Sequence, residues 1–174
     1  MKRSFGLWEF LGFGVTAIAG TLLHFVYDWL DKSVWIAPFS GVNESTWEHM
    51  KLLFWPTFVF AIVQYFFFQD RNNFWNVKLR GISLGISLIP IMFYTYNCVI
   101  GKSPDWLNIA IFFISAAVSF IYETKLYKKD KVYIFPSKYA IITLFTLAML
   151  FVVFTFATPK IGIFEDPLTG GFGI

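Results

Sequence analysis

Charged residues divide the chain into five apolar stretches. Asp, Glu, Lys and Arg are all absent from residues 10–27, 52–68, 82–101, 106–122 and 139–159. A helix needs about 17 to 25 mostly apolar residues to cross the hydrocarbon of a bilayer. The pattern therefore predicts an all-α fold, an integral membrane bundle of five transmembrane helices in a single domain. The predicted spans are residues 6–29, 47–68, 80–101, 105–123 and 138–158.

The composition agrees with lipid as the solvent for most side chains. Hydrophobic residues make up 57% of the chain, aromatic residues 22% and charged residues only 14%, whereas a soluble domain is about a quarter charged. A single cysteine, Cys98, excludes an intramolecular disulfide and a thiolate metal cluster built from one chain. The Gly-x-Ser-x-Gly spacing at residues 81–85 lies inside a predicted transmembrane span and not at a strand-to-helix elbow, and no phosphate-binding glycine-rich loop occurs, so no common catalytic motif indicates a reaction.

The distribution of Lys and Arg predicts the orientation. Ten of the 14 basic residues lie in residues 1–5, 69–81 and 123–138, and four lie in the other connections and the tail. Because basic connections stay inside, the N-terminus is predicted to be cytoplasmic and the C-terminus extracytoplasmic. The basic segment at 125–138 could also contact anionic lipid headgroups. Nothing beyond this charge indicates binding to nucleic acid.

The first apolar stretch has an alternative interpretation. Met1-Lys2-Arg3, an apolar run and the small residues Ala17-Ile18-Ala19 are typical of a cleaved signal peptide. Glu9 fits poorly in the apolar part of such a peptide, and hydrophobicity continues to Leu30. We therefore favour a retained transmembrane helix.

The segment GVNESTWEHMK, residues 41–51, is unusually polar for its surroundings. Ser45-x-x-Glu48 matches a capping box, in which the hydroxyl accepts from the Glu48 amide and the carboxylate reaches back. Trp47 would anchor the helix start at the membrane interface. This structural interpretation leaves Glu44 and His49 unexplained.

Most other polar residues fall at the same predicted membrane face. His24 and Asp28 are four residues apart, so the carboxylate could orient the imidazole and raise its basicity. Ionisable groups within the hydrocarbon are costly and often mark function. We therefore take His24, Asp28 and Glu48 as candidate acid, base or catalytic residues. The candidates for substrate binding are Tyr94, Asn97 and Trp47.

The same region offers ligands for a divalent metal ion such as zinc, which takes three or four nitrogen or oxygen ligands. The candidate ligands are His24, Asp28, Glu44, Glu48 and His49. Their spacing matches no fixed metal motif, so a metal cofactor is one possibility among others.

Spacing also predicts which helix faces point inward. Gly14, Ala17, Thr21, His24 and Asp28 advance by three and four residues and form one stripe on the first helix. On the third helix, Ser83, Ser87, Pro90, Tyr94 and Asn97 form a second stripe, and Gly81-x-x-x-Gly85 offers a close packing face.

The tail EDPLTGGFGI, residues 165–174, contains turn signals rather than a membrane span. It could fold over the outer cavity as a lid, or it could be disordered. The sequence favours neither alternative.

The chain resembles a family of small bacterial polytopic membrane proteins that is known only as a domain of unknown function. The resemblance rests on N-E-S-x-W-E-H-x-K at 43–51 and on the closing run at 166–174, and it extends over the full chain. It implies a multi-pass protein of the bacterial inner membrane and brings no activity. Intramembrane metal hydrolases such as alkaline ceramidases also cluster His, Asp and Glu near one membrane face. They have more helices and a separated histidine pair that this chain lacks, so the comparison is an analogy.

Two functions of different classes fit these observations. The first is a polar pocket at the extracytoplasmic side that binds or processes a lipid or small amphiphile, with or without a metal ion. The alternative is a small transporter or accessory membrane subunit that uses His24, Asp28 and Glu48 to bind protons or cations. A purely structural role for the 41–51 segment remains a third interpretation.

Overall fold

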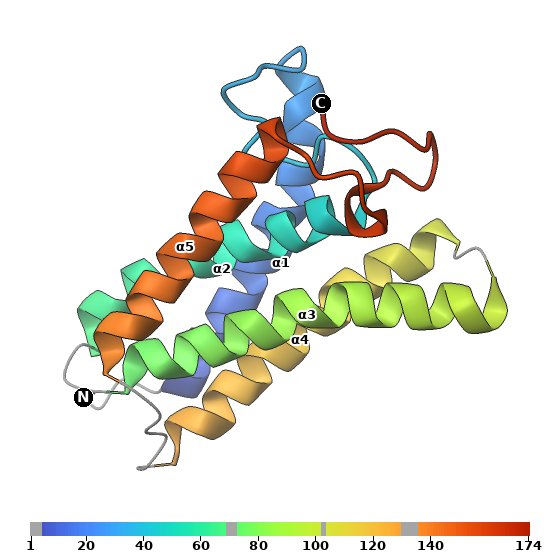
Figure 1. Cartoon of the computed structure of the whole chain (residues 1–174). Coiled ribbons are helices and arrows are strands. Elements are labelled where there is room, and N and C mark those ends of the chain that lie inside the picture. The colour runs from blue at the N-terminus through green and yellow to red at the C-terminus, as the bar shows by residue number, and fades with distance from the viewer. Residues whose placement is uncertain (1–4, 69–72, 102–103, 130–135) are drawn as a thin grey trace.

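The fold consists of five long helices and a short C-terminal segment (Figure 1). The computed structural model describes residues 5–68, 73–101, 104–129 and 136–174. The elements are α1 (Phe5–Trp29), α2 (Thr46–Phe68), α3 (Phe74–Ile100), α4 (Asp105–Tyr127), α5 (Ser137–Phe156) and the 3-10 helix η1 (Gly162–Phe164). The predicted all-helical fold is confirmed, and all five helices are long and apolar enough to cross a membrane.

Large apolar side chains cover the outside of the bundle. Phe10, Ile18 and Trp106 are each about two-thirds exposed or more, at 71%, 67% and 67%. Soluble monomers rarely expose large contiguous apolar surfaces. The five helices therefore indicate a multi-pass membrane protein whose outer face is solvated by lipid. Several basic residues used to predict the orientation (Lys2, Arg3, Arg71 and Lys131) lie outside the described residues, and the orientation stays a prediction.

The helix α2 lies at the centre and contacts each of the other four helices. Glycines allow its neighbours to come close. A Cβ atom on Gly12 of α1 would lie 2.5 Å from a ring carbon of Phe60 on α2 and 2.6 Å from one of Phe120 on α4. Small residues at such positions let helices in lipid gain van der Waals contact.

The inward face of α1 differs from the predicted stripe. The buried positions are Phe5, Glu9, Gly12, Thr16 and Gly20. The predicted stripe is wrong at its ends, because a Cβ on Gly14 would meet nothing within 4 Å and Asp28 is exposed. The reason is that Glu9 is buried and accepts hydrogen bonds from Gln64 of α2 and Lys78 of α3. These contacts fix the rotation of α1 about its own axis.

The packing face predicted on α3 is present. A Cβ on Gly81 would lie 2.1 Å from Cγ of Glu123, and one on Gly85 would lie 3.0 Å from Cβ of Ser119. The Ser119 hydroxyl donates to the Gly81 carbonyl at 2.8 Å. The helix α3 also begins earlier than the predicted span, so Lys78 is a buried residue of the second turn of α3 rather than part of a basic connection.

Candidate functional site

The loop between α1 and α2 folds back onto the last turns of α1. The Ser40 hydroxyl donates to the Leu23 carbonyl and accepts from the Tyr27 amide at 2.9 Å. The Gly41 amide donates to the same Leu23 carbonyl at 3.2 Å. These bonds stabilise the returning loop, and the residues that follow, including Glu44, therefore lie beside α1.

Half of the predicted capping box forms at the start of α2. The Glu48 amide donates to the Ser45 hydroxyl at 3.4 Å, as the motif requires. The Glu48 carboxylate does not reach back to Ser45. It accepts instead from the Val42 amide at 3.0 Å, while the Ser45 amide donates to Oδ1 of Asn43 at 2.9 Å.

Glu48 belongs to a buried ion pair. Its carboxylate lies 2.5 Å from Nζ of Lys51, and both side chains are almost fully enclosed. Lys51 Nζ also donates to the Ala37 carbonyl at 2.7 Å and to the Thr155 hydroxyl at 3.2 Å. The pair therefore joins the loop, α2 and α5.

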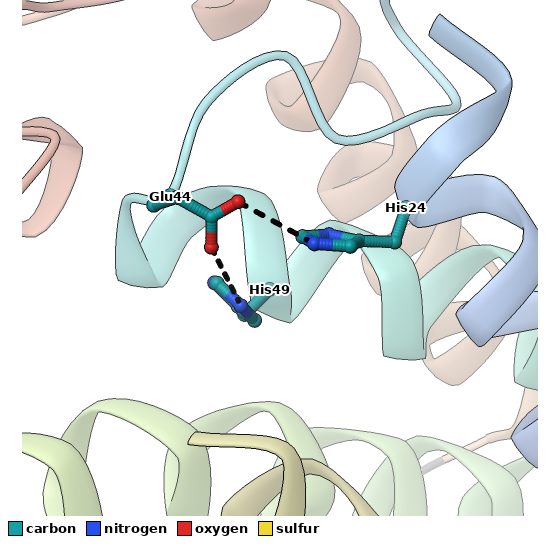
Figure 2. Close-up of side chains that lie close together, drawn as sticks. All are labelled: His24, Glu44 and His49. Carbon is teal, nitrogen blue, oxygen red and sulfur yellow. Dashed lines mark ion pairs between the residues drawn. The ribbon is translucent and has the colours of Figure 1, made fainter. Parts of the chain in front are cut away.

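Three other side chains of the region do come together. Figure 2 shows Glu44 of the loop between the imidazoles of His24 on α1 and His49 on α2. Glu44 Oε1 lies 3.4 Å from His24 Nε2, and Oε2 lies 3.7 Å from His49 Nε2. All three side chains are partly exposed. We call this group the His–Glu–His cluster.

The hydrogen bond of His49 orients its ring. Nδ1 lies 2.9 Å from the Ser45 carbonyl oxygen, which can only accept, so Nδ1 carries the proton. In a neutral ring, Nε2 then presents a lone pair to Glu44, which is also an acceptor. A cation or a proton between these two atoms would turn a repulsion into an attraction. Histidine ligands commonly donate their second N–H to a backbone carbonyl in this way.

The cluster is close to the dimensions of a zinc site. One ligand atom from each residue can be chosen so that all three lie within 4.8 Å of one another. Ligand atoms about 2.0 to 2.1 Å from a tetrahedral zinc ion are separated by about 3.3 Å. The distances from Glu44 to the two imidazoles, 3.4 Å through Oε1 and 3.7 Å through Oε2, are near that value. Two histidines and one glutamate leave a fourth position open, as in catalytic zinc sites.

The predicted partner of His24 is not the one found. Asp28 is exposed on the last turn of α1, and the carboxylate that contacts His24 belongs to Glu44. The i, i+4 rule brings Asp28 to the same side of α1, but the returning loop covers His24 with its own carboxylate. Of the five predicted ligands, the structure gathers His24, Glu44 and His49 and separates Asp28 and Glu48 from them.

The three predicted substrate-binding residues have other contacts. Trp47 packs against Phe151 of α5 and Phe164 of η1, with ring centroids 4.6 Å apart in both cases. The Tyr94 hydroxyl donates to the Gly162 carbonyl at 2.9 Å. Asn97 donates to the Phe93 carbonyl one turn earlier at 3.0 Å. Their binding of a substrate stays a prediction. None of the three lines either of the two hollows that open beside the His–Glu–His cluster.

Two adjoining hollows open beside the His–Glu–His cluster. The larger has a volume of about 200 Å³ and is mostly apolar; its lining includes His24, His49, Leu52, Phe112 and Phe113. The smaller is about 10 Å³, close to the size of one water molecule, and is lined in part by Glu44, Thr46 and His49. The cluster thus lies where a water-sized space meets an apolar groove between α1 and α4.

The C-terminal tail is ordered and packs at this end of the bundle (Figure 1). The Thr46 hydroxyl donates to the Ile163 carbonyl at 3.0 Å, and Asn43 Nδ2 donates to the Gly173 carbonyl at 3.1 Å. Asp166 closes the turn by accepting from the Leu168 amide and the Thr169 hydroxyl. The tail therefore stabilises the start of α2, next to the cluster.

Residues 2–174 match a family of unknown function (DUF6512). The chain belongs to this family. No curated protein matches the chain, and no solved structure matches it. The family thus describes the whole chain and assigns no activity to the cluster.

A second polar group lies at the other end of the bundle, and the sequence pattern does not predict it. Glu9, Gln64, Lys78 and Glu123 come from four helices and are all buried. Glu9 and Gln64 are polar residues with apolar neighbours on both sides, and this pattern is the sequence signal that could have indicated the group. The predicted third span begins at residue 80, so Lys78 falls in a predicted basic connection. Its position between the two carboxylates is therefore not predicted.

Proposed function

We propose that His24, Glu44 and His49 bind one divalent transition-metal ion of the zinc type, and that the open coordination position acts on an amphiphilic molecule. The observation that carries this proposal is the hydrogen bond from His49 Nδ1 to the Ser45 carbonyl. It turns the Nε2 lone pair toward Glu44, so that two acceptors face each other 3.7 Å apart. A metal ion is the partner that both groups would share.

The chemistry at such a site follows from the open position. A zinc ion held by His24, Glu44 and His49 would supply Lewis-acid polarisation of a carbonyl or phosphoryl oxygen and would make a water molecule at the open position more acidic. The water-sized hollow beside Glu44 and His49 offers space for that water. Hydrolysis of an ester, amide or phosphoester headgroup is the reaction that these parts fit best.

The groove favours an amphiphile over a water-soluble substrate. Its lining is mainly aromatic and aliphatic, and His24 and His49 lie at one side of it. An acyl chain could lie against Phe112 and Phe113 while its polar head reaches the metal. In keeping with the basic connections and the family resemblance, we place the protein in the bacterial inner membrane with this end outside the cytoplasm.

Metal content tests the proposal. Protein purified in detergent and stripped with chelator would be dialysed against equal zinc concentrations and measured by elemental analysis. We expect about one zinc per chain in the wild type. In His49→Ala and Glu44→Gln the affinity should fall at least about tenfold, because even partners outside the ligand shell contribute 10- to 100-fold.

Asp28→Asn is the matched control, because it removes an exposed carboxylate one turn from His24 and should leave zinc binding unchanged. Equal zinc content in the wild type and Glu44→Gln would contradict the proposal, as would a wild type that binds none. Circular dichroism of each variant would show that the helices are intact.

The groove has a separate test. Ile109 lines it and is 59% exposed, whereas Ile114 on the same helix is 49% exposed and is not among its lining residues. Ile109→Trp should fill the groove and reduce the lipid that mass spectrometry detects with the purified protein. Ile114→Trp should not. Identical bound lipid in both variants would contradict binding in the groove.

A further inference from the structure

A second buried polar group lies near the N-terminal end of the bundle. Lys78 of α3 lies between two carboxylates, with Nζ 2.8 Å from Glu9 Oε1 on α1 and 2.6 Å from Glu123 Oε2 on α4. Gln64 of α2 donates to the same oxygen of Glu9 at 2.8 Å. The side chains of Glu9, Lys78 and Glu123 are at most 2% exposed. We call Glu9, Lys78 and Glu123 the buried triad.

The charges of the buried triad do not balance. Two carboxylates and one ammonium leave a net charge of −1 if all three are ionised. Among the described residues, the charged groups that face one another here are Glu9 from α1, Lys78 from α3 and Glu123 from α4, and α2 contributes the neutral Gln64. The remaining surroundings of the ammonium are aromatic rings 5.6 to 5.8 Å away, from Phe5, Phe74 and Phe120.

The hydrogen bonds are also incomplete. Glu9 Oε2, Glu123 Oε1 and Gln64 Oε1 are buried acceptors that receive no hydrogen bond from the described part of the protein. The carboxyl groups of Glu9 and Glu123 are neighbours, because one oxygen of each lies 2.8 and 2.6 Å, respectively, from the same Lys78 nitrogen. One added proton would therefore supply a missing donor and bring the net charge to zero.

The energetic argument favours that proton. An uncompensated ion in a medium of low dielectric costs several kcal/mol even after the protein relaxes. Two carboxylates that share one site avoid ionising together. Lys78 already neutralises one carboxylate, so the second is the group that takes the proton.

We propose that Glu9, Lys78 and Glu123 form a proton-binding site that holds one exchangeable proton on its carboxyl pair at neutral pH. When the proton leaves to water, the second carboxyl ionises and the net charge changes from 0 to −1. The site is distinct from the His–Glu–His cluster and does not depend on a metal ion there.

A mostly apolar groove lies beside the buried triad. It lies between α1 and α4, has a volume of about 290 Å³ and reaches the Glu9 side of the triad; Gly6, Glu9, Phe13, Phe120 and Thr124 line it. The absence of a Cβ at Gly81 leaves the space that the Glu123 side chain occupies. A proton-loaded site of this kind is what a proton-coupled membrane protein requires.

Infrared spectroscopy tests the proposal directly, because a protonated carboxylic acid has a carbonyl stretch that a carboxylate lacks. Spectra of the folded protein in detergent at neutral pH should show such a band, and it should shift in D₂O and disappear at alkaline pH. Glu9→Gln and Glu123→Gln should each abolish it, because the remaining carboxylate then pairs with Lys78 alone. Glu165→Gln, an exposed carboxylate of the tail, should retain it.

Wild type without a band that titrates at alkaline pH would overturn the proposal. A band that survives in both Glu9→Gln and Glu123→Gln would also overturn it, because the proton would then belong to another group. The alkaline titration uses wild type only, so the test remains decisive if a variant fails to fold.

Discussion

The ion pair of Glu48 and Lys51 should stabilise the fold rather than take part in chemistry, and Lys51→Met tests this. Methionine keeps the length of the side chain and removes its charge. Lys51 is fully buried, and its Nζ contacts a carboxylate, the Ala37 carbonyl and the Thr155 hydroxyl. After the substitution, the enclosed Glu48 carboxylate would retain only the Val42 amide as a partner.

The expected cost follows from this burial. Removing one partner of a buried ion pair costs about 3 to 5 kcal/mol, because the other charge is left uncompensated. For a chain of this size, 1 kcal/mol corresponds to a shift of about 2 to 4 °C in Tm, so Lys51→Met should lower Tm by about 6 to 20 °C. The double variant Glu48→Gln, Lys51→Met has no buried charge, and most of the loss should be recovered.

Thermal unfolding in one detergent, followed by circular dichroism at a fixed scan rate, measures both effects. Lys160→Met is the control, because it removes an exposed lysine of the tail. The reasoning is refuted if Lys51→Met unfolds at the same temperature as Lys160→Met. It is also refuted if the Tm loss of the double variant equals the sum of the losses measured for Glu48→Gln alone and Lys51→Met alone. A coupled pair must be non-additive.

Two further predictions concern packing. Gly81→Ala should destabilise the protein by about 1 to 3 kcal/mol, because the added Cβ would overlap the Glu123 side chain. Gly14→Ala should be neutral or stabilising by up to about 1 kcal/mol, because the added Cβ would meet no atom within 4 Å. Equal unfolding temperatures for the two would contradict the close α3–α4 approach. Tyr94→Phe removes the hydrogen bond to the Gly162 carbonyl, so limited proteolysis should cut residues 159–174 faster than in Tyr96→Phe. Equal cleavage rates would show that this bond does not hold the tail.

The elements of the fold were predictable because lipid imposes a simple rule on sequence. Each helix must be long and apolar, so five uncharged runs were sufficient to predict five helices. A rule of this kind ends each predicted helix near the closest charged residue. Lys78 violates the rule, because two carboxylates on other helices compensate its charge, and α3 consequently begins at Phe74.

The site was predictable only in part, for a related reason. Spacing along a helix indicates which residues share a face, and by this rule His24 and Asp28 lie on one side of α1. The position of Glu44 depends on hydrogen bonds from Ser40 and Gly41 to the Leu23 carbonyl. Such loop contacts leave no periodic signal, so the sequence could suggest the three residues of the His–Glu–His cluster but could not separate them from Asp28 and Glu48.

The two proposed sites require different cations, and this makes pH a means of separating them. The His–Glu–His cluster has no cation of its own, and its imidazoles bind metal only when neutral. Protons compete with a metal ion for the imidazole nitrogens, so acid should remove zinc from the cluster, while the carboxyl proton of the buried triad remains. Alkali has the opposite effect, because it ionises the triad and leaves the imidazoles neutral. Zinc content and the carbonyl band, measured in one pH series, should therefore change on opposite sides of neutrality. A single shared transition would contradict two independent sites and would mean that the ends of the bundle are coupled through α1, which contributes a residue to both.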